Sequence, residues 1–307
     1  MPKMHISRSI EIAKPAEEVY KYLNDFHHWA TWSPWIIQEP DCKIHVDEDG
    51  KFQSWDGKRI GSGEIRITDE SENEYINYDL RFLKPWKSKS KTRFELKSIG
   101  DITEVTWIMN GSLPFFMFWM KKMMEAFVGM DYQRGLTMLK DLIEDGQVHS
   151  KINMNGESQF SGKKYVAIRT NCTMTELGPN MKEDFEKLGD FFTENKSSGC
   201  GEAFSIYHKW DVVSGRASYT SGMFVDQVPD QLPSGFIKGE IPATKIFTIG
   251  HTGPYTHLGN AWTTLYTMAR NKEIRQNKKI DPFETYKNSP NEVPENELVT
   301  EVHIPVK

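Results

Sequence analysis

Cysteine, long apolar runs and basic charge are all scarce in this chain of 307 residues. The three cysteines are Cys42, Cys172 and Cys200. Because they are far apart and odd in number, they argue against a disulfide framework or a cysteine-rich metal site, and a reducing cytoplasm is the expected location. No run of about 18 apolar residues occurs, so we expect no stable membrane insertion. The first residues also lack the basic and apolar segments of a secretory signal.

Basic charge is too scarce for a nucleic-acid binder. The chain has 43 acidic and 38 basic side chains, and acidic residues predominate in both halves. A phosphate backbone demands the opposite excess, and no helix-turn-helix or zinc-finger pattern is present, so we expect no nucleic-acid partner. The sequence also lacks a phosphate-binding glycine loop, a Gly-x-Ser-x-Gly motif and histidines at metal-ligand spacing. We therefore expect no cofactor and no metal ion.

The first half of the chain has the pattern of an α+β domain. Residues 5–12 alternate as a strand does, residues 16–26 predict a short helix, and residues 42–109 predict several strands separated by turn residues. Apolar residues then recur at helical spacing over 117–144, and Gly146 is a plausible stop. This order predicts a curved sheet around one helix, with a cavity between them, over residues 1–147.

The second half predicts a separate α+β domain with a weak internal duplication. Residues 148–162 are polar and are expected to form a linker, and residues 163–307 are expected to form the domain. Two β-α-β-β units are predicted. The first has strands over 165–173, 204–210 and 217–224 and a helix over 181–195; the second has strands over 243–251, 283–286 and 299–306 and a helix over 255–275.

The first half resembles the polyketide-cyclase branch of the START-like (SRPBCC) superfamily. The most specific match is Trp32-Ser33-Pro34-Trp35. The other matching segments are Ser7–Ile12, Val19-Tyr20, Asn24-Asp25-Phe26, Trp29, Trp55-Asp56-Gly57, Gly61-Ser62-Gly63, Asp131-Tyr132, Gly135-Leu136 and Leu139-Lys140. The resemblance implies a helix-grip fold with a pocket for apolar ligands, and it implies no particular reaction. In the resembling family the tryptophan cluster mainly closes one end of the barrel, so a structural role is expected for it.

The second half resembles the GyrI-like (gyrase-inhibitor-like) family, the AraC-type effector-binding domain of drug-responsive transcription activators. The matching segments are Gly250–Tyr255, in which Gly253-Pro254-Tyr255 opens the helix, Phe283-Glu284-Thr285-Tyr286 and the ending Leu298–Lys307. The resemblance implies a pseudo-symmetric, aromatic-lined pocket around a buried glutamate, which takes lipophilic and often cationic compounds; some relatives are hydrolytic. A START-like domain stands here where those regulators carry a DNA-binding domain, which removes the main reason to predict a transcription regulator.

Glu284 is the first candidate site residue, because a carboxylate among aromatic walls would attract a cationic ligand. Glu301 is the second, and it shares a strand face with His303. If the two carboxylates were close, one pKa would rise and a general acid–base pair would form. The alternatives are an exposed strand glutamate for Glu284 and an edge-strand salt bridge for Glu301. The candidate aromatic walls, for which core packing is the alternative, are Tyr255, Trp262, Tyr207 and Trp210.

The methionine-rich segment 117–130 leaves three interpretations open: core packing, an adaptable pocket wall and an amphipathic contact with a membrane surface flanked by Lys121 and Lys122. For the whole chain the sequence favours non-catalytic binding of small hydrophobic molecules, including lipophilic cations, in one or both pockets, for sensing, sequestration or detoxification. One alternative is a hydrolase with Glu284 or Glu301 as general base and Tyr255 as hydrogen-bond donor. The other is a protein-interaction module with a large exposed apolar patch.

Overall fold

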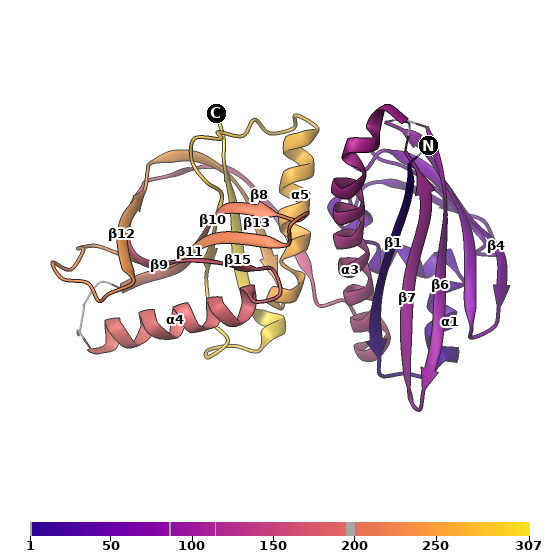
Figure 1. Ribbon diagram of the computed structural model, residues 1–307, viewed down its shortest axis with the longest axis horizontal. Helices are drawn as coiled ribbons and strands as arrows, with labels where there is room; N and C mark the ends of the chain where they lie inside the picture. The colour runs from indigo at the N-terminus through magenta and orange to yellow at the C-terminus, as the bar shows by residue number, and fades with distance from the viewer. Residues whose placement is uncertain (1, 86, 114, 195–199) are drawn as a thin grey trace. The chain divides into compact units, whose positions relative to one another are not determined.

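The computed structural model describes residues 2–85, 87–113, 115–194 and 200–307. The chain divides into two compact units, Met1–Ser150 and Lys151–Lys307, and each is built on one antiparallel sheet with helices (Figure 1). The mixed α+β class expected from the sequence is confirmed. No helix within the described ranges has the length and apolar character needed to cross a bilayer.

The first unit contains a seven-stranded sheet in the order β1-β7-β6-β5-β4-β3-β2. After β1 the chain crosses to the far edge, and the remaining strands follow one another back until β7 pairs with β1. The strands are β1 (Lys3–Ile12), β2 (Lys43–Val46), β3 (Phe52–Asp56), β4 (Ser62–Ser71), β5 (Tyr75–Lys84), β6 (Ser88–Ile99) and β7 (Ile102–Ser112).

A long helix, α3, lies along β1 in the first unit (Figure 1). The backbone N–H of His5 donates to Glu125 at 3.1 Å near the start of the helix. Gly146 ends α3 in the left-handed conformation, as the sequence predicted, because glycine adopts a positive φ without strain. The helical segments of this unit are α1 (Ala16–Leu23), η1 (Phe26–His28), α2 (Trp29–Trp32), η2 (Ile36–Gln38), η3 (Phe115–Met120) and α3 (Lys121–Asp145).

Large aromatic side chains fill much of the space between this sheet and α3. The ring of Trp107 on β7 stacks on that of Tyr132 on α3, with centroids 3.8 Å apart and planes at 10°. Phe94 stacks on Trp107 from β6 at 4.8 Å, and Trp32 is fully buried beside them. The structural role expected for the tryptophan cluster is therefore confirmed for Trp32.

The second unit contains an eight-stranded antiparallel sheet in the order β12-β9-β11-β10-β14-β15-β13-β8. Its strands are β8 (Lys151–Phe160), β9 (Lys163–Thr173), β10 (Cys200–Asp211), β11 (Arg216–Val225), β12 (Phe236–Ile241), β13 (Thr244–Thr252), β14 (Phe283–Tyr286) and β15 (Val299–Pro305). Its helical segments are α4 (Leu177–Glu194), η4 (Tyr255–His257), α5 (Gly259–Arg270) and η5 (Glu295–Glu297).

The structure corrects the sequence interpretation at several places in this unit. The predicted linker 148–162 is wrong over most of its length, because β8 pairs with β13 along the sheet edge. Its side chains are mostly exposed, which explains why the segment looked like a linker. Strand β12 was not predicted. The helix predicted over 255–275 is shorter and begins as a 3-10 turn, whereas α4 begins before the predicted 181; the predicted end of α4 at Asn195 lies outside the described residues.

The two helices of the second unit cover one face of its sheet and leave the central strands between them. Helix α4 packs on β9 and β11, and α5 packs on β13 and β15. Phe185 of α4 contacts the ring of Tyr286, and Trp262 of α5 donates to Glu284. Tyr286 and Glu284 both belong to β14, so this strand lies between the two helices and turns these side chains to the face of the sheet that the helices cover.

Candidate functional site

Glu284 lies at the centre of the helix-covered face of the second sheet. It pairs with Ser205 on β10 and with Val302 on β15. Because side chains alternate along a strand, Glu284 and Tyr286 share this face, while Phe283 and Thr285 point to the other. The side chain is buried, with 1% of its surface exposed. The expectation that Glu284 faces inward is confirmed.

Three aromatic donors hold the Glu284 carboxylate. The hydroxyl of Tyr286 donates to Oε2 at 2.7 Å, and the hydroxyl of Tyr207 donates to the same oxygen at 3.1 Å. The indole N–H of Trp262 donates to Oε1. Tyr286 comes from the same strand, Tyr207 from β10 and Trp262 from α5, so three elements position the group. Such bonds to a charged acceptor are stronger than bonds between neutral groups.

Burial raises the pKa of Glu284 from 4.5 to about 6, although the three hydrogen bonds lower it. Removal from water penalises the charged form, and the donors offset only part of that cost. Among the residues that the structure describes, none with a basic side chain forms an ion pair with Glu284. At neutral pH the site therefore holds a mostly ionised, buried carboxylate whose charge no basic side chain in the described part of the chain balances.

Aromatic rings lead from Glu284 toward the surface. The ring of Tyr207 contacts those of Trp262 and Trp210, with centroids 5.2 and 5.7 Å away. The ring of Tyr255 contacts that of Tyr286 at 5.6 Å. Tyr255, Trp210 and also Tyr266, which stacks on Trp262, are each between 40% and 45% exposed. The structure thus brings Tyr255, Trp262, Tyr207 and Trp210 together with Glu284.

Glu301 does not join this group. It pairs with Thr285 across β14 and β15, so its side chain lies on the opposite face from Glu284. Its carboxylate forms an ion pair with Lys287 at 2.8 Å and accepts from the amide of Asn155 at 3.1 Å. The acid–base pair of Glu284 and Glu301 considered from the sequence is therefore wrong. The structure shows the salt bridge expected as the alternative for Glu301, but β15 lies between β14 and β13 and is not the edge strand that was expected.

Sequence reasoning missed two members of the cluster, Tyr286 and Tyr266. Tyr286 belongs to the Phe-Glu-Thr-Tyr motif, and its spacing of two from Glu284 on a strand places both side chains on one face. Tyr266 follows Trp262 by four positions on α5, which is one helical turn. Both periodicities were present in the sequence. The face of Glu301, in contrast, depends on strand register, which no local pattern gives.

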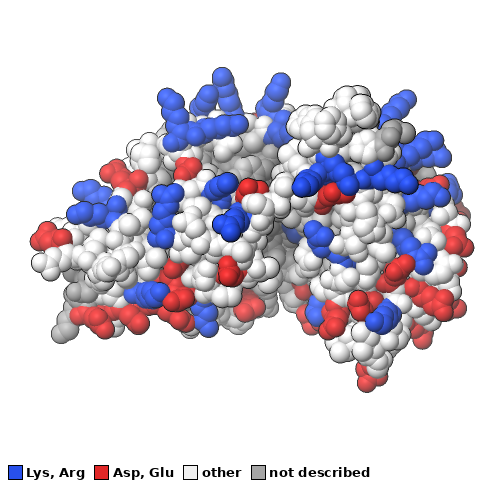
Figure 2. Space-filling view, viewed as in Figure 1, with Lys and Arg blue, Asp and Glu red and all other residues white. Residues whose placement is uncertain are grey.

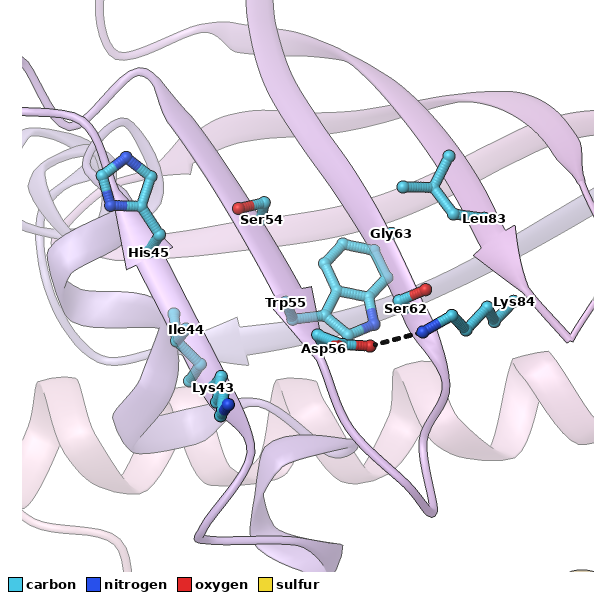
Figure 3. A pocket seen from close by; sticks show the side chains of 10 residues that line it. All are labelled: Lys43, Ile44, His45, Ser54, Trp55, Asp56, Ser62, Gly63, Leu83 and Lys84. Atoms are coloured by element: carbon cyan, nitrogen blue, oxygen red, sulfur yellow. Dashed lines mark hydrogen bonds and ion pairs between the residues drawn. The ribbon is translucent and has the colours of Figure 1, made fainter.

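The first unit has an open groove of about 480 Å³ at the β2 edge of its sheet. Figure 3 shows the ring of Trp55 lying across Gly63, where a Cβ would come within 2.4 Å of that ring. Lys84 and Asp56 form an ion pair at 3.1 Å beside it. The lining residues are Lys43, Ile44, His45, Ser54, Trp55, Asp56, Ser62, Gly63, Leu83 and Lys84. A ligand in the groove would meet the apolar ring of Trp55 and the Lys84–Asp56 ion pair, whose two charges cancel.

Comparisons with known proteins found a family match for each half of the chain. Residues 158–307 match the family described as the GyrI-like small molecule binding domain. Residues 3–144 match the family described as polyketide cyclase / dehydrase and lipid transport. These matches confirm both resemblances expected from the sequence. A comparison with curated proteins found no match.

Several solved structures are similar to parts of the chain. The EcmrR–DNA complex shares 16% identity at a TM-score of 0.42, over 62% of this chain and 69% of that one. The C-terminal domain of EcmrR shares 18% identity at a TM-score of 0.39, over 52% and 98%. The Aha1 dimer from Colwellia psychrerythraea shares 18% identity at a TM-score of 0.36, over 47% and 98%.

Proposed function

Since the chain joins a polyketide cyclase-type domain to a GyrI-like small-molecule-binding domain, we propose that it binds a small lipophilic cation around Glu284. The observation that carries the proposal is the buried carboxylate, which three aromatic donors hold and which no cation balances among the described residues. The domain organisation that we propose is a helix-grip domain in the first unit, Met1–Ser150, and a duplicated β-α-β-β domain in the second, Lys151–Lys307, to which β8 is added as an edge strand.

Electrostatics favour a cationic ligand over a neutral one. A buried carboxylate costs several kcal/mol unless it is paired, and a ligand cation supplies the missing charge. The faces of Tyr207, Trp262 and Tyr255 add cation–π attraction of about 0.5–2 kcal/mol each where they meet the ligand. The half-exposed rings mark the side from which it enters. Sequestration, sensing or detoxification of such compounds in the cytoplasm is the role we propose.

Calorimetric titration with benzyl quaternary ammonium ions and their neutral tert-butyl isosteres tests the proposal. The wild type should bind the cation more tightly than the isostere, and Glu284→Gln should remove most of that preference. Glu301→Gln is the matched control, because this carboxylate lies on the other face and should leave the preference unchanged. Affinity for the cation should also fall as the pH drops through about 6, where Glu284 takes up a proton.

Two results would contradict the proposal. Equal affinity for cation and isostere would mean that the carboxylate does not select charge. A preference that survives Glu284→Gln would move the site elsewhere in the chain.

A hydrolase is the second candidate, and the raised pKa of Glu284 is the observation that favours it. A carboxylate with a pKa near 6 is a better general base at neutral pH than an ordinary one. Tyr255 would donate a hydrogen bond to the substrate. The test is turnover of activated aryl esters, with kcat/KM rising through a pKa of about 6 in the wild type and lost in Glu284→Gln. Binding without turnover would leave the first proposal standing alone.

For the first unit we propose a lipid-like or polycyclic apolar ligand. The groove beside Trp55 and the family's description as a lipid-transport domain support this proposal. Quenching of protein fluorescence by such a ligand should shrink in Trp55→Leu and persist in Glu284→Gln.

A further inference from the structure

The segment η3 exposes four large aromatic side chains. Phe115, Phe116, Phe118 and Trp119, here called the aromatic tip, are each between 60% and 77% exposed. In the same stretch Leu113 and Met117 pack against the core, so the segment is anchored by its smaller apolar residues while its rings point outward. Isolated exposed apolar residues are ordinary, but four rings in five positions form a patch, and such patches mark interaction surfaces.

Strand register places the aromatic tip at one end of the first sheet. Strand β7 leads into η3, and its last residue, Ser112, pairs with Lys3 at the start of β1. The start of β6 pairs with the end of β7, and the end of β5 pairs with the start of β6. Helix α3 begins directly after the tip. The end of β5, the start of β6, the start of β1 and the start of α3 therefore lie at the same end of this unit as the aromatic tip.

Lysines populate these surrounding segments. They are Lys3, Lys84, Lys87, Lys89, Lys91, Lys121 and Lys122. Lys84 pairs with Asp56 and Lys121 with Glu125. Among the described residues no carboxylate forms an ion pair with the other five. This end of the unit thus combines exposed rings with a cluster of uncompensated positive charge.

The opposite end of the same sheet is acidic. Its turns carry Asp47, Glu48, Asp49, Glu72, Glu74 and Asp101. Figure 2 shows Lys and Arg side chains gathered where α3 begins in this unit, and acidic ones gathered toward the other end. This charge separation would orient the unit in an electric field, with the aromatic tip toward a negative surface.

We propose that the aromatic tip and its lysines dock the first unit on an anionic lipid bilayer. Phe and Trp side chains partition into the boundary between headgroups and acyl chains, and lysines at that depth attract anionic headgroups. The charge pattern selects this occupant, because two copies meeting through the same basic ends would repel each other. The contact is peripheral and is formed by residues of the first unit.

Flotation of the full chain with phosphatidylcholine vesicles, with and without phosphatidylglycerol, tests the proposal. Binding should require phosphatidylglycerol and weaken as salt is added, because salt screens the lysines. Phe116→Ser combined with Trp119→Ser should lower the partition coefficient at least tenfold. Replacing Lys87 and Lys89 by Gln should lower it roughly fivefold per lysine. All four side chains are exposed, so the variants should keep the wild-type circular dichroism spectrum.

The matched control removes a lysine and an exposed apolar side chain from the acidic end. Lys97→Gln combined with Ile99→Ala should bind vesicles as the wild type does. A wild type that stays with the lipid-free fraction at low salt would overturn the proposal, as would tip variants that float like the wild type. Sedimentation equilibrium tests whether the aromatic tip instead binds a second copy of the chain. A wild-type dimer that becomes monomeric in Trp119→Ser, in a protein that does not bind vesicles, would assign the tip to a dimer contact and would refute membrane docking.

Discussion

Replacing Glu284 by glutamine should raise the stability of the second unit, relative to the wild type, as the pH rises from acid to neutral and alkaline values. The pKa of this carboxyl is about 6 in the folded chain and 4.5 in the reference state, a difference of about 1.5 units. At 1.36 kcal/mol per unit, ionisation of Glu284 costs the folded state about 2 kcal/mol. The side chain is buried, so solvent screening does not reduce this figure substantially.

The sign follows from proton binding. The folded state holds the Glu284 proton more tightly than the unfolded state does, so its contribution to stability is complete below pH 4.5 and lost as the pH rises through 6. Glutamine carries no charge at any of these values. The advantage of Glu284→Gln over the wild type should therefore grow by about 2 kcal/mol between pH 4 and pH 8.

Differential scanning calorimetry at a series of pH values measures this difference. Glu297→Gln, at an exposed position, is the control and should follow the wild type across the range. A wild-type-to-variant difference that stays constant with pH, or that grows in the opposite direction, would show that the buried charge is already compensated. A cationic ligand would then find no unbalanced charge at Glu284.

Three further substitutions test individual contacts. Tyr286→Phe removes the 2.7 Å donor to Glu284 and should raise the pKa of that carboxyl further, measured by carboxyl-carbon NMR titration; an unchanged pKa would contradict the assigned bond. Trp107→Ala should cost the first unit about 3–5 kcal/mol in urea unfolding, because the stacked ring leaves a cavity, whereas a cost below 1 kcal/mol would contradict close packing. Glu39→Ala removes the acceptor of three backbone N–H groups in the β3–β4 turn and should lower the free energy of unfolding by about 2–3 kcal/mol in the same assay. Glu39→Gln keeps one acceptor oxygen and should lose only part of that stability. Equal stability of wild type and Glu39→Ala would show that water replaces the carboxylate.

Elements with strong periodicity could be predicted from the sequence. Helix α3 shows apolar residues at helical spacing and a glycine stop, and β14 was predicted with the bounds that the structure gives it. Strand β8 could not be recognised, because an edge strand with few buried side chains lacks the alternation that a half-buried strand shows. Its pairing with β13 is a tertiary property that local propensity does not encode.

The candidate site was predictable in part for the same reason. Alternation in a short strand pointed Glu284 inward, and its grouping with Tyr207 and Trp262 is seen in the structure. The position of Glu301 depends on which residue of β14 it faces. A shift of one residue in register would have moved it to the face of Glu284. The sequence specifies this choice only through packing of the whole sheet.

The pairing of β8 with β13 has a consequence for the order in which the chain folds during synthesis. The first sheet contains only strands β1 to β7, so the first unit can fold once its own residues have left the ribosome. Strand β8 emerges next, yet its partner ends only at Thr252. Until then β8 is an unpaired edge in a nascent chain. The mostly polar side chains of β8 lower the risk of incorrect pairing before β13 is synthesised, because a polar edge strand attracts few other strands.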